Sequence, residues 1–426
     1  MNYTKLNSML LSKRRKENIM KKDRIELLLE SSFLFDPNIY MTVVVTIEGD
    51  ISEDKICEAV KKTYTQNQTT MSKVVIDEQG KVYLEEMEET GCKVFVDKRD
   101  WMEILHENER KPFRLEDGEL IRTFIIPRGE QKDIFLMAHH LSGDGGALMI
   151  LAEDIFNNID GKEVQYKQTK VITGEESMKR GNLNFLQKLG LKSLSQKWGE
   201  HKTVFGWNDY YKVHEEFWKN SCTDISFIEI EGSELDNLKA DCKKLGVTIN
   251  TYLVTKLMKE YYPDTKKLGI PISVRGEEKS ISCLVSSATP HAQYDTNKEF
   301  VENLVMIDKA IKKDLKDDGE VYKIPQFIAI SDPTLVCAAY VNDVLKNIES
   351  PQVEKMADIL GLQGGHDRVN LGITNLREII FPSDYNSFKV TNVIPVAPCI
   401  GTTENIFTIS TFNGKMLIAE TKIRKM

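Results

Sequence analysis

The chain has 426 residues, of which 57 are basic and 65 acidic, so its formal net charge at pH 7 is −8. This length allows two or three domains with a substantial core, and the acidic balance argues against nucleic acid as the main partner. No apolar run approaches the roughly 20 residues that span a bilayer, and the amino-terminal basic cluster is followed by further charge instead of the apolar stretch of a signal peptide.

The first part of the chain alternates predicted strands and helices after a polar, basic leader, residues 1–22. β-Branched runs and hairpin turns predict the strands, and capping residues with helical spacing predict the helices. The expected elements are a strand over 41–47, a helix capped by Ser52, hairpins over 74–84 and 120–139, and a helix over 147–158 that ends at Gly161.

The composition changes in the middle of the chain. Residues 162–220 carry 11 basic against 7 acidic side chains and three of the four tryptophans, with short helical fragments around 183–194. We interpret residues 166–220 as a crossing linker or a lid between two larger parts.

The second part opens with a predicted strand over 225–230 and a helix that Ser233 caps and that ends near Gly246. Later strands are expected over 269–274, 368–373, 387–392, 406–412 and 415–419, the last two joined by a tight turn at Asn413-Gly414. The strand-turn-helix unit at 45–61 resembles the unit that begins at 225. This similarity indicates two comparably built α/β halves, 23–165 and 221–426.

The most informative segment is His139-His140-Leu141-Ser142-Gly143-Asp144-Gly145, at the junction of a buried strand and a helix. Histidine is the side chain best suited to accept a proton near neutral pH, and the small residues of the loop leave room for a substrate. Because strand side chains alternate, only one of the two histidines can face a given cleft. The sequence does not choose between them.

Two other interpretations of this segment compete with catalysis. The histidine can be a satisfied core residue, with Asp144 acting only as the N-cap of the following helix. A metal site is disfavoured, because adjacent strand histidines diverge and no further cluster completes a ligand shell. The seven scattered cysteines form no Cys-x-x-Cys pair, which predicts reduced thiols in a cytoplasmic protein.

The pattern His-His-x-x-x-Asp-Gly resembles the motif of the condensation-domain and chloramphenicol acetyltransferase-like acyltransferase superfamily, nearest to its alcohol acetyltransferase and stand-alone condensation branches. The order of elements is also similar. The further segments that resemble the family are Asp23-Arg24 before an apolar helix, Pro271 to Arg275, Ser282 to Gln293, and Thr374-Asn375-Leu376.

The resemblance implies an α/β fold with mixed sheets, in which two acetyltransferase-like halves form a V with a central tunnel. It also implies that His140 deprotonates or orients the acceptor, with His139 in support. Asp144 would pair with an arginine, for which Arg275 is the candidate unless it is an ordinary surface charge. Gly145 would let the loop backbone approach the reacting centre.

Other site residues are expected further along the chain. An oxyanion donor is needed, and Ser410 or Thr411 on a late strand are candidates for this role or for the tunnel wall. Asn375 is either a cap of a turn or a residue that lines the tunnel.

The resulting hypothesis is an acyltransferase of secondary metabolism that carries no bound cofactor. Its co-substrate would be an acyl-CoA or the phosphopantetheinyl arm of a separate acyl or peptidyl carrier protein, and its acceptor an alcohol or an amine. The first alternative is a catalytically silent relative that uses the cleft only for binding or docking. The second is a thioester hydrolase in which water replaces the acceptor.

Overall fold

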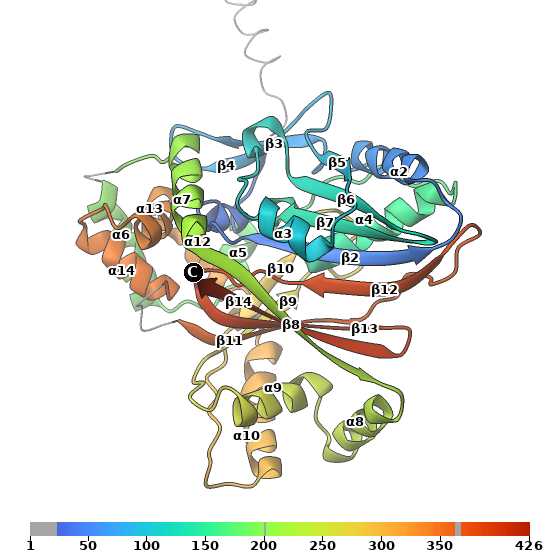
Figure 1. Ribbon diagram of the computed structural model, residues 1–426. Helices are drawn as coiled ribbons and strands as arrows, with labels where there is room; N and C mark the ends of the chain where they lie inside the picture. The colour runs from blue at the N-terminus through green and yellow to red at the C-terminus, as the bar shows by residue number, and fades with distance from the viewer. Residues whose placement is uncertain (1–23, 200–201, 363–367) are drawn as a thin grey trace, which may run out of the picture.

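The structure is a computed structural model that describes residues 24–199, 202–362 and 368–426. The predicted basic leader, residues 1–22, lies outside the described residues. Within the described part, three β-sheets pack with helices between and around them (Figure 1). The prediction of an α/β fold with mixed sheets is confirmed.

A five-stranded sheet carries the heptapeptide 139–145. It contains β2 (Tyr40–Glu48), β5 (Lys93–Val96), β6 (Ile121–Arg128), β7 (Gln131–His139) and β12 (Lys389–Val396). The order is β12-β2-β7-β6-β5, and only β5 and β6 run parallel. The β-branched residues of β2 suit its buried position between β12 and β7.

Three helices follow the strands of this sheet, namely α2 (Glu53–Thr65), α3 (Trp101–Asn108) and α4 (Gly145–Ile159). Ser52 caps α2 as predicted, because its hydroxyl accepts the main-chain N–H of Lys55 at 3.3 Å. α2 and α4 pack against each other, and Asn158 of α4 donates to the hydroxyl of Thr63 at 2.8 Å. This contact fixes the helix that starts at the heptapeptide.

A small sheet of order β1-β4-β3 contains β1 (Arg24–Glu26), β3 (Ser72–Ile76) and β4 (Val82–Glu86). The α-helix expected directly after Arg24 is wrong. Arg24 pairs with Glu85 of β4, and the N–H of Leu27 donates to the carbonyl of Val82 at 2.9 Å. Because β4 binds this backbone, only one 3-10 turn, η1 (Glu30–Phe33), follows.

The second large sheet contains β8 (Ser221–Glu231), β9 (Leu268–Ser273), β10 (Val285–Ala288), β11 (Val369–Glu378), β13 (Thr403–Phe412) and β14 (Lys415–Lys425). Its order is β10-β9-β11-β13-β14-β8. α8 (Gly232–Leu245), α9 (Ile249–Glu260) and α10 (Phe300–Lys316) lie below this sheet in Figure 1. A second hydrophobic core, which includes Val254 and Ile409, lies at this sheet.

Two local sequence predictions in this sheet have opposite outcomes. The predicted hairpin at Asn413-Gly414 is confirmed, and both residues adopt the positive φ values, 49° and 75°, that such a turn requires. The predicted cap at Ser233 is wrong. β8 stays paired with β14 up to Glu231, so α8 starts at Gly232 and Ser233 lies inside its first turn.

β12 connects the two large sheets. Its residues come late in the chain, yet they pair with β2 from Lys389 opposite Glu48 to Val396 opposite Thr42. Directly after β12, the N–H of Ala397 donates to the hydroxyl of Thr408 in β13 at 2.8 Å. The two sheets therefore meet along β12 and β13. The division of the chain at residues 166–220 stays a prediction.

The remaining helices lie beside the sheets. They are η2 (Leu115–Asp117), α5 (Gly174–Arg180), α6 (Phe185–Gly199), α7 (Trp207–Lys219), α11 (Asp318–Val321), α12 (Lys323–Ile330), α13 (Pro333–Leu345) and α14 (Pro351–Leu360). Among the described residues no single helix is long and apolar enough to cross a membrane. α12 and α13 meet that criterion only as a pair, which is bent by 102°.

Candidate active site

The heptapeptide forms a tight connection between β7 and α4. β7 ends at His139, a 3-10 turn η3 spans His140–Ser142, and α4 begins at Gly145. A Cβ atom at Gly143 would lie 2.7 Å from the Cβ of Ala147 and 3.4 Å from the backbone of Ser282. Only glycine therefore allows the loop to pass this close to α4 and to the second half of the chain.

His139 is the buried member of the histidine pair, with 2% of its surface exposed. Its Nδ1 accepts the N–H of Leu141 at 3.2 Å, and its ring lies 5.8 Å from Phe113 and 6.4 Å from Tyr210 between ring centres. Burial, followed by repulsion from neighbouring groups of which His140 is the first, lowers its pKa to about 3. His139 is therefore a neutral packing residue at neutral pH.

His140 is the half-buried member of the pair. Its main-chain N–H donates to the carbonyl of Ile39 at 2.9 Å, and its ring centre lies 5.3 Å from that of Phe33. Nδ1 is buried and has no hydrogen-bond partner among the described residues. Burial lowers the pKa of this imidazole, and the charge of Asp144 opposes that shift. A neutral imidazole is the form that can accept a proton.

Asp144 is the centre of a buried polar cluster that joins the two halves. Its carboxylate caps α4 by accepting the N–H of Ala147 at 2.9 Å, and it also accepts the N–H of Leu284 at 2.7 Å. Nη2 of Arg275 lies 2.9 Å from each of its two oxygens. Asp144 is therefore the N-cap of α4, but the interpretation that it acts only as an N-cap is wrong, because Arg275 and Leu284 also bind its carboxylate.

Arg275 fixes a second segment against the loop. Its guanidinium donates to the carbonyls of Ser280 and Ser282, each at 2.6 Å, while its Nε is buried without a partner in the described part of the chain. The side chain is 9% exposed, so it is not an ordinary surface charge. Residues 280–284 are thus held beside the histidine loop.

β11 contacts the same loop from another side. A Cβ atom at Gly145 would lie 3.1 Å from Cδ2 of Leu376. The neighbouring Asn375 is half-buried, and its side-chain oxygen accepts the N–H of Arg377 at 2.7 Å, where the pairing of β11 with β13 shifts register. The side chain of Asn375 therefore stabilises a local turn one residue away from the contact with Gly145.

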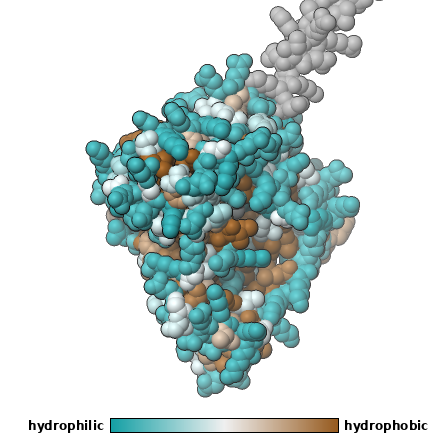
Figure 2. Space-filling model, turned by 90° about the vertical axis from the view of Figure 1, so that its right-hand side faces the viewer, coloured by the Kyte–Doolittle hydropathy of each residue, from teal (hydrophilic) through white to brown (hydrophobic). Residues whose placement is uncertain are grey.

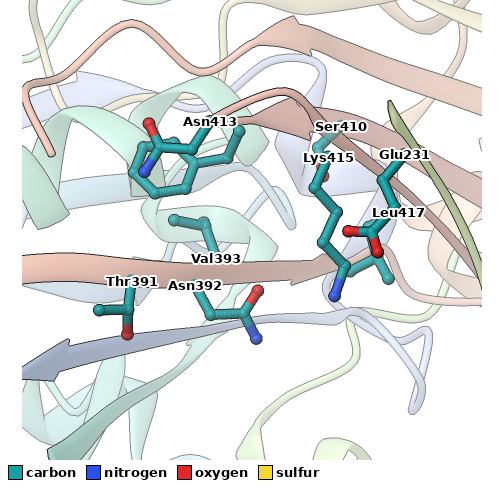
Figure 3. A pocket seen from close by; sticks show the side chains of 9 residues that line it. Glu231, Thr391, Asn392, Val393, Ser410, Asn413, Lys415 and Leu417 are labelled. Atoms are coloured by element: carbon teal, nitrogen blue, oxygen red, sulfur yellow. The ribbon is translucent and has the colours of Figure 1, made fainter. Parts of the chain in front are cut away.

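A cleft of 190 Å³ lies between β12 and the β13–β14 hairpin. Figure 3 shows Asn392 and Val393 on one side of it and Lys415 and Leu417 on the other. Figure 2 shows apolar residues gathered in the hollow between the upper and lower parts of the molecule. Ser410 and Thr411 are both buried in β13, and of the two only Ser410 is among the lining residues of the cleft.

The strand register relates this cleft to the histidines. Val393 pairs with Val45, and Tyr40, five residues earlier in β2, pairs with His139. At about 3.3 Å per residue, the cleft is offset from His139 by roughly 16 Å along the strand. The cleft that Ser410 lines is therefore separated from the histidine loop, and the role of Ser410 stays a prediction.

One residue near the site was missed by the sequence analysis. Glu30 lies in η1, which packs against η3, and only 1% of its surface is exposed. Its Oε2 has no partner among the described residues, and burial raises its pKa to about 7. The signal in the sequence is a lone carboxylate after Leu27-Leu28-Leu29, but its burial depends on tertiary packing.

The fold is shared with condensation domains. The first condensation domain of the CDA synthetase superposes with a TM-score of 0.59 at 10% identity, covering 94% of this chain and 90% of that one. Polyketide synthase associated protein 5 from Mycobacterium tuberculosis gives 0.56 at 12%, covering 93% and 92%. A variant of the starter condensation domain of rhizomide synthetase in complex with C8-CoA gives 0.60 at 10%, covering 96% and 91%.

At these identities the likeness shows the fold alone. The chain has the two chloramphenicol acetyltransferase-like halves of condensation domains, as the sequence predicted. No protein-family model matches the chain, and no curated protein does.

Proposed function

We propose that this protein is an acyltransferase that moves an acyl group from a thioester to an alcohol or an amine, with His140 as the general base. The observation that carries the proposal is the contrast within the histidine pair. His139 is enclosed and its Nδ1 is hydrogen-bonded, whereas His140 is half-buried and directly follows β7. Burial lowers the pKa of both rings, so both are neutral bases, and the exposure of His140 distinguishes the two. The condensation-domain fold supports the same reaction class.

In the proposed reaction, Nε2 of His140 accepts the proton of the acceptor hydroxyl or amine while the acceptor oxygen or nitrogen attacks the thioester carbonyl. Before this step the imidazole is neutral and carries its own proton on Nδ1, and after it the ring is an imidazolium. Collapse of the tetrahedral intermediate breaks the carbon–sulfur bond, and the imidazolium returns a proton to the departing thiolate. The base is regenerated, and no oxidant or metal is consumed.

The Asp144–Arg275 cluster supports this reaction by positioning. It fixes the start of α4 and residues 280–284 around the loop, and the charge of Asp144 favours the protonated form of His140. Holding two reactants in place contributes about 7–11 kcal/mol to catalysis in favourable cases. We propose that substrates approach through the space between the halves, with the Ser410 cleft as one end.

The donor in this proposal is an acyl-CoA or an acyl group on a separate carrier protein. A solved structure with the same fold was determined in complex with C8-CoA, and another in complex with a substrate analogue. These are properties of those proteins. They make short- and medium-chain acyl-CoA the first donors to test.

The experiment offers the full chain a panel of acyl-CoA donors with alcohols and amines, and measures thiol release and acylated product by mass spectrometry. The proposal predicts an ester or amide that disappears in His140→Ala and persists in His291→Ala, a change at an exposed loop histidine. Free acid as the sole product would indicate a hydrolase. Donor binding without turnover, unchanged by His140→Ala, would indicate a silent binding module.

A further inference from the structure

α6 carries an apolar surface that the rest of the protein leaves uncovered. Phe185 is 76% exposed, Leu186 74% and Leu189 52%. Residues three and four apart share one face of a helix, so these three side chains form a single projection at the start of α6. Figure 1 places α6 at the left-hand edge of the molecule, beside α14.

The projection is held rigidly from the opposite face of the helix. Leu191 and Trp198 are buried, and Nε1 of Trp198 donates to the hydroxyl of Thr334 at 2.8 Å. Ser195 accepts the N–H of Asp332 at 3.0 Å. α6 is therefore anchored on α13 and its surroundings, and the exposed side chains are not a consequence of a loosely attached helix.

All the charged side chains of α6 are positive. Between Phe185 and Gly199 there are three lysines and no acidic residue. Lys188, Lys192 and Lys197 form no ion pair with any residue that the structure describes. Lys192 lies three residues after Leu189, so cations border the apolar projection. A partner for this surface must accept apolar side chains and carry negative charge.

Two occupants from the chain itself fit poorly. A second copy packed symmetrically would bring the same lysines against each other. The amino-terminal segment carries Lys13-Arg14-Arg15-Lys16 and has the same sign of charge as α6.

An acidic protein has the right charge. The area of three side chains, however, is far smaller than the roughly 800 Å² that each partner of a stable complex contributes.

We propose that α6 is a docking surface for a bilayer with anionic headgroups. A bilayer needs no preformed pocket. Phe185, Leu186 and Leu189 would enter the boundary between headgroups and acyl chains, and the lysines would contact the anionic headgroups. The surface is separate from the histidine loop and does not depend on the acyltransferase assignment.

The test is co-sedimentation of the full chain with phosphatidylcholine vesicles that contain about 30% phosphatidylserine. Wild type is expected to bind these vesicles, to bind pure phosphatidylcholine vesicles much less, and to dissociate as salt is raised. Phe185→Ser with Leu186→Ser is expected to lower the bound fraction roughly tenfold. Lys188→Gln with Lys192→Gln is expected to remove much of the preference for phosphatidylserine.

The matched control is Val301→Ser with Val305→Ser on α10, where the side chains are 47% and 54% exposed but acidic residues are interspersed. This variant is expected to bind like wild type. Because all the replaced apolar side chains are exposed, each variant should keep the melting temperature of wild type. Failure of wild type to bind the anionic vesicles would overturn the proposal. Equal binding by wild type and the α6 serine variant, or equal losses in both serine variants, would do the same.

Discussion

Nη2 of Arg275 lies 2.9 Å from both carboxylate oxygens of Asp144, and the two side chains are only 9% and 8% exposed. The pair joins segments 131 residues apart in the chain. Desolvation offsets much of the attraction in such a pair, so its main consequence is positional. It determines where the histidine loop lies relative to residues 280–284.

The first prediction concerns this pair. Arg275→Ala leaves the Asp144 carboxylate buried without its cation, and we expect the free energy of unfolding to fall by about 3–5 kcal/mol. Urea unfolding followed by circular dichroism measures it. Arg24→Ala, which removes a 46% exposed arginine from Glu85, should cost less than about 1 kcal/mol. Equal losses in the two variants would contradict a special role for the Arg275 pair.

The second prediction concerns His139. Because its ring fills a buried position beside Phe113 and Tyr210, His139→Ala should leave a cavity and lower the free energy of unfolding by about 2 kcal/mol or more. His291→Ala, at an exposed position, should leave it unchanged. Thermal unfolding compares the two. A His139→Ala protein as stable as wild type would show that this ring does not pack as described.

Gly143 gives a third prediction. In Gly143→Ala the new methyl group would lie 2.7 Å from the Cβ of Ala147, so the loop or α4 must shift, at a cost of about 1–3 kcal/mol. Gly190→Ala is the control, because a Cβ there meets nothing within 4 Å on an exposed helix. That change should be neutral or slightly stabilising. Differential scanning calorimetry measures both, and a neutral Gly143→Ala would contradict the close approach.

A fourth prediction follows from the pKa of Glu30, which burial raises from 4.5 to about 7. Between these two values the folded protein holds a proton that the unfolded chain has lost, so this group's contribution to stability falls as pH rises from 4.5 to 7. Glu30→Gln stays neutral and avoids that loss. Relative to wild type it should gain on the order of 3 kcal/mol between pH 4.5 and pH 8.

The pH dependence of urea unfolding in the two proteins tests this. His139 and His214, whose pKa values burial lowers to about 3, give the opposite trend between pH 3 and 6.5, and they act equally in both proteins. The difference between variant and wild type therefore isolates Glu30. A flat difference between Glu30→Gln and wild type over this pH range would mean that Glu30 is not buried as the structure has it.

Local signals in the sequence predicted the elements that position the site. The β-branched run of β2, the cap at Ser52 and the turn at Asn413-Gly414 each act over a few residues, and each is present in the structure. The strand that ends at His139 was predicted for the same reason. The pattern of the heptapeptide then indicated the fold, through resemblance instead of through local physics.

What the sequence did not predict depends on tertiary packing. α13 is buried on all sides from Thr334 to Val341, so it lacks the amphipathic period that reveals a surface helix. Glu30 has an unusual pKa only because η1 is enclosed. The local pattern did not choose between His139 and His140, and only the family resemblance favoured His140. Which of the two rings is enclosed became visible only in the coordinates.

The most direct test of the central claim is the rate of acyl transfer by His140→Ala under single-turnover conditions, once a donor and acceptor are found. If His140 is the general base, the rate falls by about 10²–10⁴-fold with an unchanged melting temperature and unchanged donor affinity. A His140→Ala protein that transfers the acyl group at the wild-type rate would contradict this role.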